Sequence, residues 1–171
     1  MADFTMQTQK EDKWCWAAVT VSINNFLDPQ AVPAWTQATL ATKVLGPPPG
    51  EGKILATVDC SLTPDQCDFP AALTDALTAT GNLSGDPLLG PLPFASLTES
   101  IDDNLPVCAQ IDWFSGGAHA VALDGYRTYT SGAQAVLVQD PLYKSGFHFY
   151  DDLVNNYPPG GKWAATFLVK A

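Results

Sequence analysis

Cys15 is the residue best placed to act as a nucleophile, because it lies between Trp14 and Trp16 where a helical pattern begins. Apolar residues recur downstream at helical spacing, which predicts a helix over residues 16–27. Unpaired backbone N–H groups and the helix dipole at such an N-terminus favour an anion such as a thiolate. We therefore predict a reactive thiol; the alternative is a small apolar residue buried at a helix start.

A thiol nucleophile needs a base that keeps it ionised, and the sequence holds two histidines. His119 opens a predicted strand shortly after Gly116 and Gly117, which leave room for a substrate backbone. His148 lies between two phenylalanines, where a partly buried or surface histidine is expected. We predict that His119 is the base and that Gly116 and Gly117 bind substrate.

The base in turn needs an acceptor that orients it. Asp140 ends the next predicted strand after His119, and antiparallel neighbours bring such ends together. Asp140 also precedes a proline, which is an ordinary way to open a turn. Asp112 and Asp124 are the competing carboxylates, and we favour Asp140.

Acyl transfer also needs hydrogen-bond donors for the developing oxyanion. The backbone N–H of Cys15 supplies one, and the side-chain amide of Gln9, slightly upstream, fits the second. Gln7 is the nearby alternative. Trp14 and Trp16 are expected to line the substrate cleft, although both are equally suited to a core.

The elements that must position these side chains are helices first and strands second. Helices are predicted over residues 16–27, 34–45, 68–80 and 94–104, strands over 107–113, 118–124, 135–139, 147–150 and 163–169, and a short helix or turn over 151–157. This segregation is typical of the α+β class, with a cleft where the halves meet. We expect one domain, residues 1–171, with a helical lobe to about residue 105 and an antiparallel β lobe from about 106.

Charge and composition exclude several classes of partner. The chain has 8 Lys and Arg against 18 Asp and Glu, a net charge of −10, so it should repel nucleic acid. No apolar run of about 18 residues occurs, so we expect no membrane insertion. The N-terminus lacks the apolar stretch of a secretory signal, which predicts a cytoplasmic protein, export or delivery into a target cell by a signal-less route, or a chain whose leader has been removed.

The four cysteines show no zinc-ligand spacing with each other or with the histidines, so we expect no metal and no cofactor. Cys60 and Cys67 share a turn-rich loop and could bridge in an oxidising compartment, whereas the cytosol would keep them reduced. We favour the reduced form.

Gln9, Cys15, His119 and Asp140 occur in this order within three motifs, which span residues 9–18, 116–126 and 138–141. The order resembles that of papain-like cysteine proteases. The Trp-Cys-Trp-Ala-Ala sequence, with Asp as the third group, looks most like compact bacterial members, among them effector proteases and staphopain-like enzymes. The Cys-Gly-Ser that precedes the nucleophile in plant and lysosomal members is absent, which leaves substrate preference open.

The resemblance implies a papain-like α+β fold, in which a helical lobe packs against an antiparallel sheet or half-barrel with the active site between them. It also implies a cysteine endopeptidase, secreted as a bacterial effector or toxin. In this reading Cys15 attacks the scissile carbonyl, His119 protonates the leaving amine and Asp140 fixes the imidazole tautomer. Gln9 and the Cys15 N–H bind the oxyanion.

A protein or peptide substrate is the expected partner, with a cognate inhibitor or immunity protein as a second. The same residues would also serve a peptidoglycan amidase, a deamidase or a transglutaminase-like acyltransferase. A binding protein that keeps the fold without chemistry is the remaining alternative.

Overall fold

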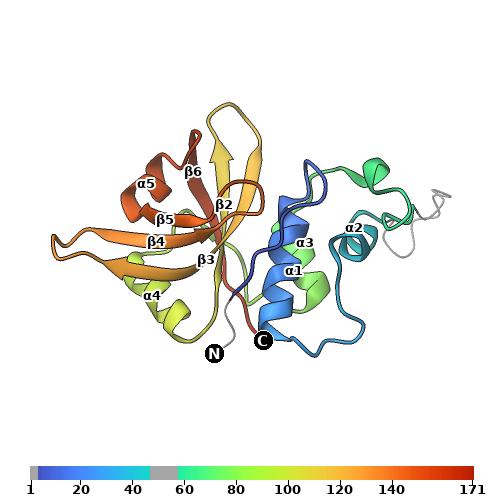
Figure 1. The fold of residues 1–171 in the computed structure, drawn as a ribbon, viewed down its shortest axis with the longest axis horizontal. Coiled ribbons are helices and arrows are strands. Elements are labelled where there is room, and N and C mark those ends of the chain that lie inside the picture. The colour runs from blue at the N-terminus through green and yellow to red at the C-terminus, as the bar shows by residue number, and fades with distance from the viewer. Residues whose placement is uncertain (1–3, 47–57) are drawn as a thin grey trace.

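The chain folds into a helical half and a sheet half that meet along one long helix (Figure 1). This computed structural model describes residues 4–46 and 58–171. In these residues the helices are α1 (Cys15–Leu27), α2 (Gln37–Leu45), α3 (Leu73–Thr80), α4 (Phe94–Asp102) and α5 (Tyr150–Asn155), with a 3₁₀ turn η1 (Pro64–Cys67). The strands are β1 (Leu88–Leu89), β2 (Val107–Trp113), β3 (Ala118–Thr128), β4 (Gln134–Gln139), β5 (Gly146–Phe149) and β6 (Gly161–Phe167). The predicted α+β class is confirmed.

Within the described residues the sheet is antiparallel and open, with the strand order β1-β6-β2-β3-β4-β5. Its register pairs Ala122 of β3 with Gln139 of β4. The residue that follows β4 therefore lies beside the first residues of β3. This register brings together two chain segments that are about twenty residues apart in sequence.

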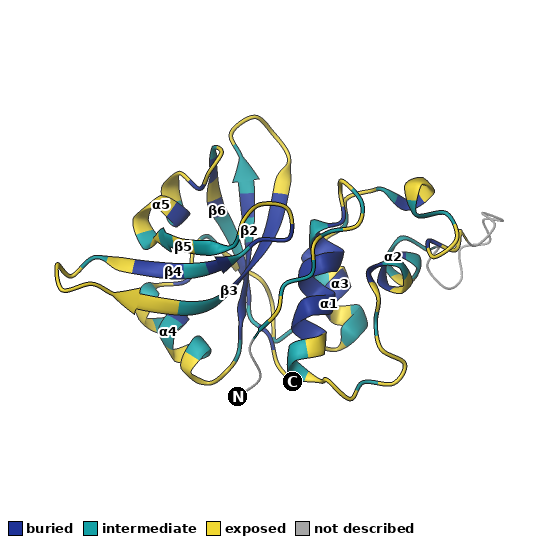
Figure 2. Cartoon of the chain, in the orientation of Figure 1, coloured by how far each residue is buried: buried dark blue, intermediate teal, exposed yellow. Residues whose placement is uncertain are grey.

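Two hydrophobic clusters lie on opposite faces of the sheet, as the alternation of side chains along a strand requires. Cys108 and Ala122 join the cluster built on α1, α2 and α3, whereas Ile111 and Leu123 join the cluster built on α4 and α5. Figure 2 shows α1 dark along most of its length, since it packs on α2, α3 and β3. The nucleophile candidate therefore begins a helix that is held on several sides.

Helix α4 packs on the sheet rather than on the helical half. Its buried Leu97 belongs to the same cluster as Ile111 and Leu123. The helical lobe thus ends earlier in the chain than the expected boundary at about residue 105. No helix in the two described ranges is long and apolar enough to cross a membrane.

Helix α3 begins five residues later than the expected start at residue 68. The carboxylate of Asp68 accepts a hydrogen bond from the backbone N–H of Lys13, and the Phe69 carbonyl accepts one from the Trp16 indole. These contacts hold the segment along the start of α1 instead of in a helix. The two-residue strand β1 lies where neither a helix nor a strand was predicted, and it forms because it pairs with the edge of β6.

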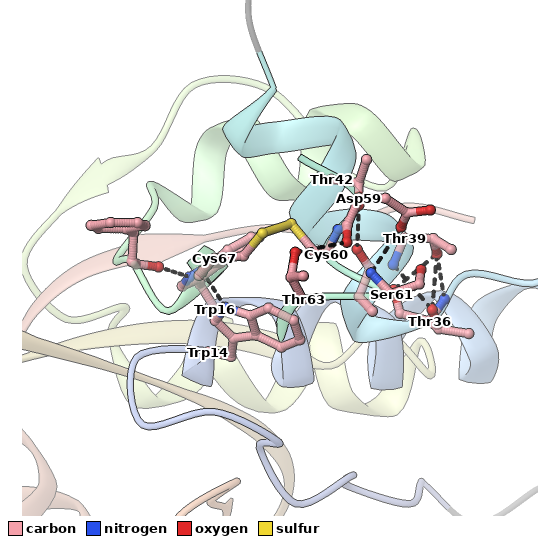
Figure 3. The surroundings of a disulfide bond; sticks show 12 residues. Trp14, Trp16, Thr36, Thr39, Thr42, Asp59, Cys60, Ser61, Thr63 and Cys67 are labelled. Atoms are coloured by element: carbon pink, nitrogen blue, oxygen red, sulfur yellow. Dashed lines mark hydrogen bonds between the residues drawn. A yellow bond between two sulfur atoms is a disulfide. The ribbon is translucent and has the colours of Figure 1, made fainter. Parts of the chain in front are cut away.

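Cys60 and Cys67 form a disulfide, so the prediction that they stay reduced is wrong (Figure 3). The turn between them brings the two Cα atoms to 5.7 Å, within the range that a disulfide bridges. The prediction rested on the compartment and ignored this local geometry. The proline run that follows Gly46 lies outside the described residues.

Candidate active site

The Cys15 thiol stands at the first residue of α1, half-buried, beside the preceding Trp14. No side chain caps this helix, and its first turn carries no acidic residue. The first amide N–H groups of α1 are therefore free of side-chain acceptors, which suits an anion at this position.

The His119 ring is placed between a carboxylate and the thiol. Its Nε2 lies 2.9 Å from Asp140 Oδ1, and the ring also forms a hydrogen bond with Cys15. His119 is 4% exposed and the Asp140 side chain is fully buried. Because one ring nitrogen is used by Asp140, the other is left for the sulfur.

The competing residues make other hydrogen bonds or none with the Cys15 and His119 pair. Asp112 and Asp124 accept hydrogen bonds from the amides of Gln110 and Gln139. His148 lies on β5, the edge strand of the sheet, where it pairs with Val136 of β4. Among the candidates weighed from the sequence, Asp140 and His119 are thus the pair that meets.

Asp140 is held by four donors. Its Oδ1 accepts from the backbone N–H groups of Leu142 and Tyr143, each at 2.8 Å, as well as from His119. Its Oδ2 accepts from the hydroxyl of Tyr157 at 2.7 Å. Burial alone would raise the pKa of Asp140, but the hydrogen bond and positive charge of His119, together with the two backbone amides, lower it.

The same contacts set the charge of the imidazole. Burial alone would lower the pKa of His119, yet its hydrogen bonds to Asp140 and Cys15 and their negative charges raise it to about 9. At neutral pH the ring is therefore protonated. An imidazolium beside the sulfur is the partner that a thiolate needs.

The second free thiol, Cys108, is a poor competitor for Cys15. It is fully buried in the sheet, and burial raises the pKa of its thiol well above the usual value. Cys60 and Cys67 are bonded to each other. Cys15 is the free cysteine of the described residues that reaches solvent.

Gln9 lies beside the loop that carries Asp140, because its backbone N–H donates to the Pro141 carbonyl at 2.9 Å. Its side-chain Nε2 donates to the carbonyls of Glu11 and Asp12, at 3.0 and 2.7 Å. Both amide hydrogens are therefore engaged in the turn that precedes Cys15. Gln7, the alternative, instead contacts the buried Gln37.

A cleft of about 340 Å³ opens over the thiol, between the helical half and the sheet. It is lined by Asp12, Lys13, Cys15, Trp16, Pro70, Ala71, Leu73, Gln110, Trp113, Gly117, Ala118, His119, Ala120 and Leu142. Of the expected substrate-binding residues, Trp16 and Gly117 lie on this wall, while Gly116 lies in the adjoining turn. Trp14 is fully buried, and its indole donates to the Cys67 carbonyl, so the structure places it in the core instead.

One family model matches most of the chain. The model of the Peptidase_C39 like family covers residues 1–165. The chain belongs to this family. It is therefore a cysteine peptidase of the papain-like kind, and its α+β architecture agrees with that fold. No curated protein matches the sequence.

The site of this C39-like peptidase contains two aromatic residues that no sequence motif marks as functional. Trp113 stacks on the His119 ring at 5.5 Å between centroids, and Tyr157 donates to Asp140. Trp113 is the last residue of a predicted strand, and this position alone indicates no functional role. Tyr157 precedes two prolines, and no motif marks it.

Proposed function

We propose that this C39-like peptidase is a cysteine endopeptidase in which Cys15, His119 and Asp140 act as a triad. The observation that carries the proposal is the position of His119, which bonds to Asp140 through Nε2 and whose ring also forms a hydrogen bond with Cys15. Cys15 and His119 also line one cleft of about 340 Å³. Nucleophile, base and orienting acceptor are thus linked by consecutive hydrogen bonds.

In the first half of the reaction the Cys15 thiolate attacks the scissile carbonyl carbon and forms a C–S bond. The carbonyl π electrons move to oxygen, where the free N–H groups at the start of α1 stabilise the oxyanion. The C–N bond then breaks, and the His119 imidazolium gives its proton to the leaving amine. Asp140 keeps the ring in the orientation that faces the sulfur.

In the second half His119 is neutral and takes a proton from water, which attacks the thioester carbon. The C–S bond breaks, the acid product leaves, and the thiolate and imidazolium are restored. Gln9 is the second proposed oxyanion donor. To reach the substrate, the Gln9 amide must give up its hydrogen bond to Glu11 or to Asp12 and point the freed N–H into the cleft.

The net charge of −10 favours neutral or basic peptides through electrostatic steering. The buried disulfide between Cys60 and Cys67 supports a protein that works in an oxidising compartment, which fits the secreted option better than the cytoplasmic one. An exported enzyme of this kind could face a dedicated inhibitor or immunity protein.

The test compares the wild type with Cys15→Ala and His119→Ala on three substrates: an unfolded basic protein, peptidoglycan, and a glutamine-containing protein with a free amine. Mass spectrometry of the products is the readout. Internal cleavage of the protein chain, lost in both variants, is the expected result. Products from peptidoglycan or the amine alone would favour amidase or acyltransferase chemistry.

A binding protein without chemistry predicts no product with any substrate. It also predicts that iodoacetamide labels Cys15 no faster than an ordinary thiol at mildly acidic pH. Fast labelling confined to Cys15 would speak against it, because Cys108 is buried and the other two cysteines are bonded.

A further inference from the structure

Tyr157 lies in the turn between α5 and β6 and reaches back to the buried carboxylate of Asp140. Its hydroxyl donates to Oδ2 at 2.7 Å, and the residue is 2% exposed. Burial and the negative charge of Asp140 hold the pKa of this hydroxyl well above its usual value. The phenol is therefore a neutral, permanent donor.

The two oxygens of Asp140 are supported differently. Oδ1 accepts from His119 and from the backbone amides of Leu142 and Tyr143. In the described part of the chain, Tyr157 supplies the one donor to Oδ2. Because the side chain is fully buried, water does not replace this donor.

The ring of Tyr157 also contacts the imidazole indirectly, through Trp113. Trp113 stacks on Tyr157 at 6.3 Å and on His119 at 5.5 Å between ring centroids. The backbones of Tyr157 and Gly161 exchange two hydrogen bonds of 2.7 and 2.8 Å, which fix the position of the tyrosine. A Cβ at Gly161 would lie 2.6 Å from Trp113, so glycine there lets the indole pack closely.

We propose that Tyr157 is a positioning residue for the C39-like peptidase, which keeps Asp140 ionised and aligned so that His119 and Cys15 stay paired in acid. This inference rests on the proposed function of the triad. A hydrogen-bond donor to a carboxylate favours its charged form. Without the hydroxyl, a proton can occupy Oδ2, and a neutral Asp140 no longer stabilises the imidazolium.

Other charged or titratable groups around Asp140 remain in place when the hydroxyl is removed. They are His119 on β3, Tyr143 in the loop after β4 and His148 on β5. Burial lowers the pKa of His148, although Asp140 and Asp152 oppose this, and Tyr157→Phe leaves both of these carboxylates unchanged. The change in acid behaviour can therefore be assigned to the hydroxyl.

The experiment measures the rate at which iodoacetamide labels Cys15 as a function of pH, by intact mass, which requires no peptide substrate. Tyr157→Phe is compared with the wild type and with Tyr150→Phe. Tyr150 is a matched control because its hydroxyl also makes one hydrogen bond, to the Leu92 carbonyl at 2.8 Å. We expect the acid limb of Tyr157→Phe to move to higher pH by about one unit, while Tyr150→Phe follows the wild type.

A double-mutant cycle separates positioning from a general loss of stability. If Tyr157 acts through Asp140, adding Tyr157→Phe to Asp140→Ala should leave the labelling profile of Asp140→Ala unchanged. Equal acid limbs in Tyr157→Phe and Tyr150→Phe, or additive losses in the cycle, would overturn the inference alone. A wild-type profile identical to that of His119→Ala would overturn the proposed function as well.

Discussion

At His119, burial and hydrogen bonding act in opposite directions on the same ring. The ring is almost removed from solvent, yet its two hydrogen-bond partners are Asp140 and Cys15, which both favour the proton. The site therefore keeps a positive charge inside the protein by placing negative charge on either side of it.

The pH dependence of activity should follow from this balance. We expect kcat/KM to fall as the pH rises through about 9, because His119 loses there the proton that pairs with the thiolate and protonates the leaving amine. On the acid side the lowered pKa of Asp140 keeps the carboxylate ionised below its usual range. Initial rates on a fluorogenic peptide test this, with recovery at neutral pH as the control. A loss centred at about 6.5, the ordinary histidine value, would contradict it.

Asp124 serves as the comparison for Asp140, since each carboxylate accepts a hydrogen bond from a side chain on the neighbouring strand. We expect Asp140→Ala to lower kcat by about 10²–10⁴-fold, because the imidazole loses the acceptor that orients it. Asp124→Ala removes an acceptor of the Gln139 amide and should leave kcat within about threefold. Similar losses in both variants would show that stability, and not orientation, is responsible.

The sequence pointed to those candidate site residues whose chemical type and position in a predicted element can be read directly. Cys15 was found from a helix start, and His119 and Asp140 from strand ends. The bonding of Gln9 was out of reach, since its amide direction depends on the carbonyls of a turn at Glu11 and Asp12. Tyr157 was missed because its contact with Asp140 is purely tertiary.

Among the elements, the loop that includes the disulfide and the first turn of α1 support each other. The Trp14 indole donates to the Cys67 carbonyl at 2.8 Å, and the Trp16 indole donates to the Phe69 carbonyl at 3.1 Å. The nucleophile is thus flanked by two side chains that are tied to the same segment (Figure 3). Sequence periodicity predicted a helix from residue 68 because it could not detect these contacts with Trp16 and Lys13.

Loss of the disulfide should therefore weaken both stability and catalysis. For a loop with a sequence separation of 7, the chain-entropy model gives a stabilisation of about 2–3 kcal/mol. We expect the Cys60→Ala/Cys67→Ala variant to lose about this much free energy of unfolding, measured by urea denaturation. A reductant should lower the stability of the wild type and leave the double variant unchanged. Equal sensitivity of both proteins would contradict the prediction.

For the whole molecule, the segregation of predicted helices before about residue 105 from predicted strands after it predicted two halves and a cleft between them. It could not predict that α4 packs on the sheet, because a buried stripe such as Leu97 and Ile101 does not say which surface it meets. Nor could it predict β1, whose two residues are too few to show a period.

The acidic surface gives a prediction at this scale. We expect kcat/KM for a lysine-rich peptide to fall as the salt concentration rises, and the value for an otherwise identical glutamate-rich peptide to rise. Salt screens charges beyond about 8–10 Å, so the two values should converge at high ionic strength. Parallel salt curves for the two peptides would rule out steering.

The hydrogen bond from the Gln9 backbone N–H to the Pro141 carbonyl connects two segments of the site. It links the segment that leads to Cys15 with the loop that follows Asp140. The backbones that carry the nucleophile and the acid are therefore held together directly. We therefore expect the cleft to be preorganised. Rigid ligands whose shape matches it should then bind more tightly than flexible ligands of equal size.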